Sequence, residues 1–139
     1  TNIKKIINNK NVTFYNNDFE HFLARLRYDL KKSYLIINDP PYINTLNPYG
    51  NEWGINNLEK LIQKNISICE KVNKYKGIDI VFFICENGDN EDVVNMAKKY
   101  NLHILNVTRR RSGYARNNDG INEILITNKI IENKNLFLC

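Results

Sequence analysis

The sequence Leu-Ile-Ile-Asn-Asp-Pro-Pro-Tyr, residues 35–42, decides the fold. Its apolar first half is typical of a buried strand. Two successive prolines cannot continue the hydrogen-bond ladder of a sheet, so the chain must leave the sheet at Asp39 in a stiff, extended turn. In open α/β sheets, ligands bind beyond the carboxyl ends of the strands. We therefore expect the Asp39 carboxylate, free backbone carbonyls and the Tyr42 ring to project from a rigid mount.

Strand-like and helix-like segments alternate along the rest of the chain, and this alternation predicts an α/β fold. The 139 residues, of which 42% are hydrophobic, suffice for one domain with a moderate core. The strand that enters the turn, 33–38, is apolar enough to be covered on both faces. Apolar runs bounded by turn residues predict four further strands, at 12–15, 78–85, 102–108 and 121–127.

Helices are expected between these strands. The first has its apolar residues on one face, namely Phe19, Phe22, Leu23, Leu26 and Leu30. The longest, 56–75, has Asn56 and Glu59 at capping-box spacing, and its apolar face comprises Leu58, Leu61, Ile62, Cys69 and Val72. Asp89 or Asn90 is expected to cap a third helix, whose acidic start and basic end complement the helix dipole.

Composition limits the class of protein. The net charge of +5 and pI near 9.1 suit a polyanionic partner without requiring one. No apolar run approaches the roughly 20 residues needed to span a bilayer, and no signal peptide is visible. The richness in Asn, Lys and Ile indicates an AT-rich genome, such as that of a bacterium or phage. Thr1 is not an initiator methionine, which fits a fragment or a processed product.

The cysteines and histidines indicate neither disulfides nor a metal. Cys69, Cys85 and Cys139 are odd in number and widely separated, with no histidine cluster near them. We therefore expect a reduced, cytoplasmic protein without a structural metal. The two histidines, His21 and His103, are isolated and more typical of ordinary surface positions than of ligands or bases.

Asp39-Pro40-Pro41-Tyr42 resembles the signature of amino-group methyltransferases that use S-adenosylmethionine, specifically the Dam-like adenine-N6 DNA methyltransferases. An exocyclic amine is a poor nucleophile because its lone pair is delocalised into the ring. The resemblance implies that the Asp39 carboxylate and the Pro40 carbonyl accept hydrogen bonds from the amine, and that Tyr42 stacks on an adenine turned out of the duplex. These four residues form its implied catalytic motif. The alternative is a proline-rich loop that merely ends a strand.

The segment 12–19 is similar to the family's strand that is followed by Asp-Phe. The resemblance implies that Asp18 and Phe19 hold the adenine of S-adenosylmethionine by a hydrogen bond and by stacking, with Asp39 also at the cofactor. An aspartate that caps a helix and a phenylalanine in the core explain the pair about as well.

A basic loop followed by a strand with an acid and a Thr-Asn end resembles the family's closing hairpin. The strand is Ile121–Thr127 and includes Glu123. Arginines suit phosphate contacts, although a solvated charge run is the usual alternative. An Asn-, Pro- and Gly-rich loop beside the motif carries two aromatics that could contact DNA or anchor the loop. The expected DNA-binding residues are Arg109, Arg110, Arg111, Arg116, Tyr49 and Trp53.

Two parts of the family pattern have no counterpart in this sequence: the glycine-rich cofactor loop and the target-recognition region. The family's sheet order is 3-2-1-4-5-7-6 with strand 7 antiparallel, and 12–15 and 33–38 resemble strands 3 and 4. The strands between them are missing, so 33–38 would expose an apolar edge. We therefore expect residues 1–139 to be a partial catalytic domain, the carboxyl-terminal half of a Rossmann-like sheet, that needs a companion polypeptide.

Three functions compete. The leading one is a complemented enzyme that transfers a methyl group from S-adenosylmethionine to adenine N6 in double-stranded DNA, in restriction protection, phage defence evasion or regulation. The second is another amine methyltransferase, acting on RNA or on a protein glutamine. The third is a non-catalytic DNA-binding remnant. Asp rather than Asn at position 39, together with the arginine loop, favours adenine in DNA.

Overall fold

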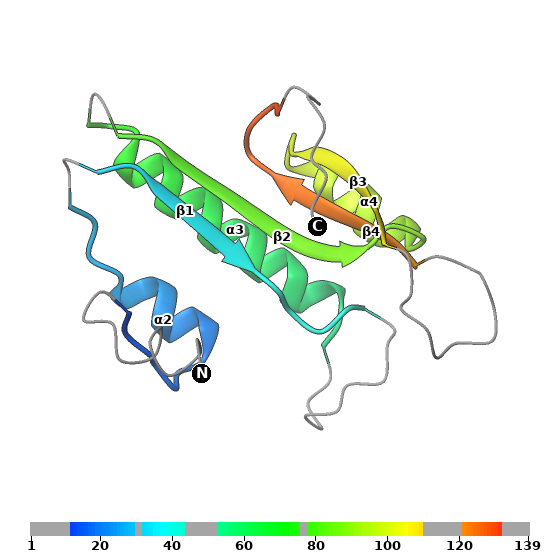
Figure 1. Ribbon diagram of the computed structural model, residues 1–139, viewed down its shortest axis with the longest axis horizontal. Helices are drawn as coiled ribbons and strands as arrows, with labels where there is room; N and C mark the ends of the chain where they lie inside the picture. Colours follow the sequence, from blue (N-terminus) through cyan, green and yellow to red (C-terminus); the bar gives the residue numbers. More distant parts are fainter. Residues whose placement is uncertain (1–11, 30–31, 44–52, 76–77, 110–120, 132–139) are drawn as a thin grey trace, which may run out of the picture.

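The computed structural model describes residues 12–29, 32–43, 53–75, 78–109 and 121–131. Within these residues a four-stranded sheet is covered on one face by α3 and α4, and α2 packs against α3 (Figure 1). This is a mixed α/β architecture, compatible with a methyltransferase-like fold. The helices are α2 (Phe19–Arg25), α3 (Ile55–Val72) and α4 (Glu91–Lys99), and the strands are β1 (Tyr34–Asn38), β2 (Ile80–Asn87), β3 (His103–Arg109) and β4 (Ile121–Thr127).

The sheet has the order β1-β2-β4-β3. β1 is parallel to β2, whereas β4 runs antiparallel to both of its neighbours. This arrangement is compatible with the order 4-5-7-6, with strand 7 antiparallel, that the resemblance implies for the last four strands. Because β1, β2 and β3 run in the same direction, their carboxyl ends lie at one edge of the sheet.

The core lies between the sheet and α3. Alternate side chains of β2 are buried on the helix side, among them Phe82 and Ile84, each 0% exposed. They face a helix whose Leu58 and Ile62 are equally buried. Burying a side chain of this size contributes roughly 1.5–3 kcal/mol. The predicted apolar face of α3 is confirmed, since every residue named for it is buried.

The helix starts test the predicted caps. Asn90 caps α4, as expected, and its side chain accepts a hydrogen bond from the Asp92 backbone N–H at 3.0 Å. The capping box predicted for α3 is wrong. The helix begins after Gly54, whose backbone N–H donates to the Asn57 side chain at 3.3 Å. The Glu59 carboxylate is instead bound by Lys99 and Tyr100, at 2.6 and 2.7 Å.

The predictions for the amino-terminal part are partly wrong. Residues 12–15 form no strand in the described structure, and Phe14 and Tyr15 are 70% and 64% exposed. A strand needs a hydrogen-bonded neighbour, and no described strand pairs with this segment. α2 also ends earlier than predicted, at Arg25.

β1 is an edge strand with one uncovered face. Leu35 and Ile37 are 60% and 67% exposed, and their parallel partners Val81 and Phe83 belong to the same face of the sheet. Cover on both faces, as predicted for this strand, is therefore not found among the described residues. The predicted free edge is found within the described residues, since none of their strands pairs with the outer side of β1. Among the described helices, none is long and apolar enough to cross a membrane.

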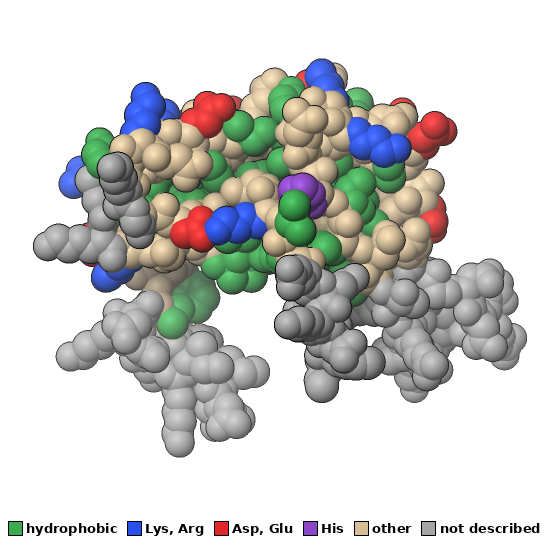
Figure 2. All heavy atoms as spheres, turned by 90° about the horizontal axis from the view of Figure 1, so that it is seen from above, with side chains coloured by type: hydrophobic (Ala, Val, Ile, Leu, Met, Phe, Trp, Pro, Cys, Tyr) green, Lys and Arg blue, Asp and Glu red, His purple; other side chains and the backbone are tan. Residues whose placement is uncertain are grey.

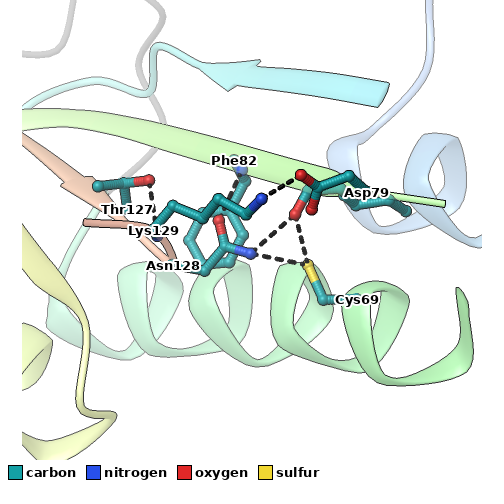
Figure 3. A network of polar contacts seen from close by, with 7 residues as sticks. Cys69, Asp79, Phe82, Thr127, Asn128 and Lys129 are labelled. Carbon is teal, nitrogen blue, oxygen red and sulfur yellow. Dashed lines mark hydrogen bonds and ion pairs between the residues drawn. The ribbon is translucent and has the colours of Figure 1, made fainter. Parts of the chain in front are cut away.

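Asn128 explains why β4 ends in Thr-Asn. Its side chain accepts from the Phe82 backbone N–H at 3.0 Å and donates to the Ile80 carbonyl at 2.9 Å (Figure 3). The amide thus satisfies β2 backbone groups just beyond the last paired residue of β4. Beside it, Lys129 forms an ion pair with Asp79 (Figure 3).

Candidate active site at the carboxyl ends of β1 and β2

The segment Asp39–Tyr42 leaves the sheet at the carboxyl end of β1, as the sequence predicts. Asp39 is exposed, whereas the two prolines and Tyr42 are half-buried. The preceding residue, Asn38, donates from its side chain to the Phe83 carbonyl at 2.9 Å. This bond holds the end of β1 to β2, so that the turn starts from a fixed point.

Tyr42 is oriented by an acid on β4. Its hydroxyl donates a hydrogen bond to Glu123 Oε1 at 3.1 Å, across 81 positions of sequence. Burial, and then the nearby Glu123 carboxylate, raise the pKa of Tyr42 well above its ordinary value. The phenol therefore stays neutral at physiological pH, and its ring has a defined direction.

Glu86 is a buried acid that the sequence analysis missed. It is 0% exposed and continues the helix-facing row of β2, in which the preceding members are apolar. Its Oε2 accepts from the backbone N–H groups of Ile43 and Asn87, at 3.3 and 3.2 Å. Burial raises the pKa of Glu86 to about 7. Its position in phase with the apolar residues of β2 is a hint in the sequence, but that hint does not distinguish a buried acid from the end of a strand that leaves the core.

Carboxylates gather around the end of β2. Burial, and then Asp39, Glu123 and Glu86 in that order, raise the pKa of the Cys85 thiol. Three acids on three strand ends or turns therefore influence one position. Such a site is rich in hydrogen-bond acceptors, and it suits a substrate that presents N–H groups better than it suits an anion.

The predicted cofactor residues lie next to this region. Asp18 caps α2, and its Oδ1 accepts from the Glu20 backbone N–H at 2.8 Å, while its side chain is 59% exposed. The Phe19 ring meets the edge of Trp53, with 5.8 Å between ring centroids. The Trp53 side chain lowers the pKa of the Glu86 carboxyl, against the larger effect of burial. Asp18 and Phe19 thus perform the capping and packing roles of the alternative interpretation, close to residues that hold the Asp39 turn.

A hollow of about 460 Å³ lies beside α2, and none of its lining residues belongs to the motif. Its lining residues are Tyr15, Asn17, Phe22, Arg25, Leu26 and Arg27. Among the described residues, no group of three or more His, Cys, Asp or Glu side chains could hold a metal ion.

The residues expected to contact DNA are only partly described. Arg109 ends β3 and pairs with Ile121, at the same edge of the sheet as Asp39. Trp53 is half-buried against Phe19, which favours loop anchoring over DNA contact. On the face shown in Figure 2, coloured Lys and Arg side chains are scattered among Asp and Glu. Three arginines and a tyrosine lie outside the described residues, namely Arg110, Arg111, Arg116 and Tyr49.

Comparison with known proteins gives one informative similarity. The chain is 32% identical, over 134 residues, to the type II methyltransferase M.FokI of Planomicrobium okeanokoites. That relative is a methyltransferase. The alignment includes 88% of this chain and 19% of the relative, so the chain spans about a fifth of the length of the methyltransferase it matches. This similarity supports a methyltransferase family. No protein-family model matches the chain, and no solved structure matches it significantly.

Proposed function

We propose that this chain is the catalytic-motif part of an S-adenosylmethionine-dependent methyltransferase that modifies adenine N6 in double-stranded DNA. One observation carries the proposal. The Asp39–Tyr42 turn lies at the carboxyl end of β1, in a sheet whose order and single antiparallel strand match those expected for this enzyme class. The similarity to a type II methyltransferase supports methyl transfer as the reaction class.

In the proposed reaction, Asp39 and Pro40 act on the amine. The exposed Asp39 carboxylate and the Pro40 carbonyl each accept a hydrogen bond from one N–H of the adenine amino group. Pulling on both hydrogens draws the nitrogen toward a tetrahedral geometry and frees its lone pair for attack. Pro40 suits this role because its backbone has an acceptor but no competing donor. Pro41 keeps the turn stiff, so that both acceptors stay aimed at one point.

Tyr42 holds the base. Its hydroxyl is bound to Glu123, so the ring has a fixed orientation before the base arrives. A base extracted from the duplex can stack on such a ring, which is worth roughly 1–3 kcal/mol. A preset ring loses little conformational entropy on binding.

The cofactor would be S-adenosylmethionine, which supplies an electrophilic methyl group. The side chains present fit its adenosine end. Asp18 remains 59% exposed although one oxygen serves as a helix cap, which leaves the other able to accept a hydrogen bond. Phe19 is half-buried against Trp53, so its ring is fixed but not fully enclosed. Asp39 would also contact the cofactor, from the Asp39–Tyr42 motif. The glycine-rich loop that would hold the methionine end has no counterpart in this sequence.

We further propose that a companion polypeptide, or a further part of the same protein, completes the sheet and reads the DNA sequence. The outer side of β1, which pairs with no described strand, and its exposed Leu35 and Ile37 support this proposal. Parallel strands are normally covered on both faces, and an exposed apolar edge invites pairing with another strand. The arginines at 109–116 would contact the phosphates.

The test is methyl transfer by the complemented protein. The chain would be combined with the polypeptide that carries the glycine-rich loop, and labelled methyl groups would be followed into DNA that is then digested to nucleosides. Asp39→Ala should lower turnover by roughly 100- to 1000-fold, since one transition-state acceptor is worth about 2–4 kcal/mol. Asp92→Ala, an exposed acid on α4, is the matched control.

The outcome of this assay separates the alternatives. Label recovered as N6-methyladenine supports the proposal. Label in RNA or protein, but not in DNA, would instead identify another amine methyltransferase. DNA binding without any methyl transfer by the wild-type complex would indicate a non-catalytic remnant. Near-normal turnover in the Asp39→Ala variant would remove Asp39 from the catalytic group.

A further inference from the structure

The two carboxyl oxygens of Glu86 differ in their hydrogen bonding. Its Oε2 accepts from the backbone N–H of Ile43, the residue that follows Tyr42 and is only 4% exposed. Its Oε1 is buried and has no hydrogen-bond partner among the described residues. A buried carboxyl oxygen without a partner is costly, and it requires an explanation.

Trp53 also has a buried polar atom without a partner in the described part of the chain, and this atom is a donor where Glu86 Oε1 is an acceptor. Its indole Nε1 is buried and likewise lacks a partner within the described residues. The indole N–H nevertheless lies near enough to the Glu86 carboxyl to oppose the rise that burial causes in the pKa of Glu86. A buried donor and a buried acceptor that are both unpaired would each gain from one hydrogen bond.

We propose that Glu86 is a positioning residue that holds Ile43 and Trp53 in place, binding the Ile43 N–H with Oε2 and the Trp53 indole N–H with Oε1. Ile43 directly follows the Asp39–Tyr42 turn, and Trp53 lies just before the start of α3. Fixing Ile43 fixes the residue next to Tyr42. Trp53 contacts Phe19 in turn. A single carboxyl therefore couples the turn to the aromatic pair beside it.

The chemistry of the residue explains why an acid occupies this buried position. An aliphatic side chain would complete the apolar row of β2 but would leave the Ile43 N–H and the Trp53 N–H without an acceptor. A carboxyl group offers two oxygens a fixed distance apart, one for each donor. The consequence for methyl transfer rests on the proposed function, whereas the positioning itself does not.

Two measurements report on Ile43 and Trp53 separately. Hydrogen–deuterium exchange of residues 39–43, read by mass spectrometry on the full chain at low concentration, reports on Ile43. Pro40 and Pro41 lack an N–H, so few amides share that signal. Trp53 is the one tryptophan of the sequence, so acrylamide quenching of its fluorescence reports on this side chain alone.

Glu86→Leu should raise exchange at 39–43 by about tenfold and quenching of Trp53 by about twofold, while exchange in β2 at 80–84 stays unchanged. Glu86→Gln should restore only one of the two signals, because its single amide oxygen replaces one acceptor and its NH2 group is a donor. Glu70→Gln, an exposed acid on α3, is the control. Wild-type exchange and quenching in Glu86→Leu would overturn the proposal, and so would a response at only one of the two residues.

Glu86→Asp keeps the charge but shortens the reach by one methylene, and it decides the question if Glu86→Leu does not fold. It should loosen at least one of the two residues, and behaviour like the wild type would overturn the proposal. In the complemented enzyme, Glu86→Leu should lower kcat about tenfold with little change in the KM for DNA. An inactive wild-type complex would count against the proposed function alone, because the exchange and quenching results would still stand.

Discussion

The carboxyl end of β1 and the open face of the same strand differ in how many contacts the described residues make with them. At the carboxyl end, both Tyr42 and Ile43 are held by acids from other strands, Glu123 and Glu86. On the open face, side chains such as Ile37, 67% exposed, have no cover among the described residues. The groups that orient the proposed chemistry therefore come from within the chain, whereas the open face of β1 has no cover from the described residues.

The open face gives the largest expected effect. Replacing both Leu35 and Ile37 by Ser should weaken binding of the companion polypeptide by roughly 100-fold or more, since each side chain would bury apolar surface worth about 1.5–3 kcal/mol. Calorimetric titration measures the change. Equal affinity of the double variant would show that the partner binds elsewhere.

The isolated wild-type chain should aggregate and bind S-adenosylmethionine weakly or not at all, and a soluble monomer with micromolar cofactor affinity would falsify this expectation.

The same contrast explains which features the sequence predicts. Ile121–Thr127 is a strand with the predicted bounds, and Asn90 is the predicted cap, because turn residues and local hydrogen bonds determine both. The strand predicted at 12–15 fails because a strand depends on a neighbour, and the chain contains no described partner for it. Local patterns identify what local contacts stabilise.

Glu86 was missed for the opposite reason. An acid near the end of an apolar run is typical of a strand that is leaving the core, and only the packed structure reveals that this one is fully buried. The motif turn was recognisable because Asp and two prolines have few structural uses together. Its supporting acids come from positions 43 and 81 residues away in sequence, and no local pattern reports on them.

Glu86 gives the next effect, on stability. Its pKa is raised from 4.5 to about 7 in the folded chain, so the neutral form is favoured by folding. That contribution is complete below pH 4.5 and is lost as the pH rises through 7, a change of roughly 3 kcal/mol. Glu86→Gln should remove this dependence, so its stability relative to the wild type should be greater at pH 8 than at pH 5. Urea unfolding at both values measures it, and parallel pH profiles would contradict the assignment.

Substitutions at Tyr42 give the next effect, and they distinguish the role of the ring from that of the hydroxyl. Tyr42→Ala should lose base stacking worth about 1–3 kcal/mol and bind a DNA substrate correspondingly less tightly in the complemented enzyme. Tyr42→Phe or Trp should keep much of the activity, although Phe loses the bond to Glu123. Steady-state methylation rates measure both. If Phe were as damaging as Ala, the hydroxyl and its acid partner would be the working part.

The smallest effect concerns the arginines at the same edge of the sheet. Arg109 ends β3, and its backbone pairs with Ile121, on the side where the Asp39 turn also emerges. Replacing Arg109, Arg110, Arg111 and Arg116 by Ala should weaken binding to many DNA sequences alike. The plot of log affinity against log salt concentration should flatten by roughly one unit for each phosphate that the variant no longer binds. The site itself is rich in acids, so DNA needs cations at its margin to approach it. An unchanged slope would identify the arginines as a solvated surface, and a weakening confined to one base position would make one of them a base reader instead.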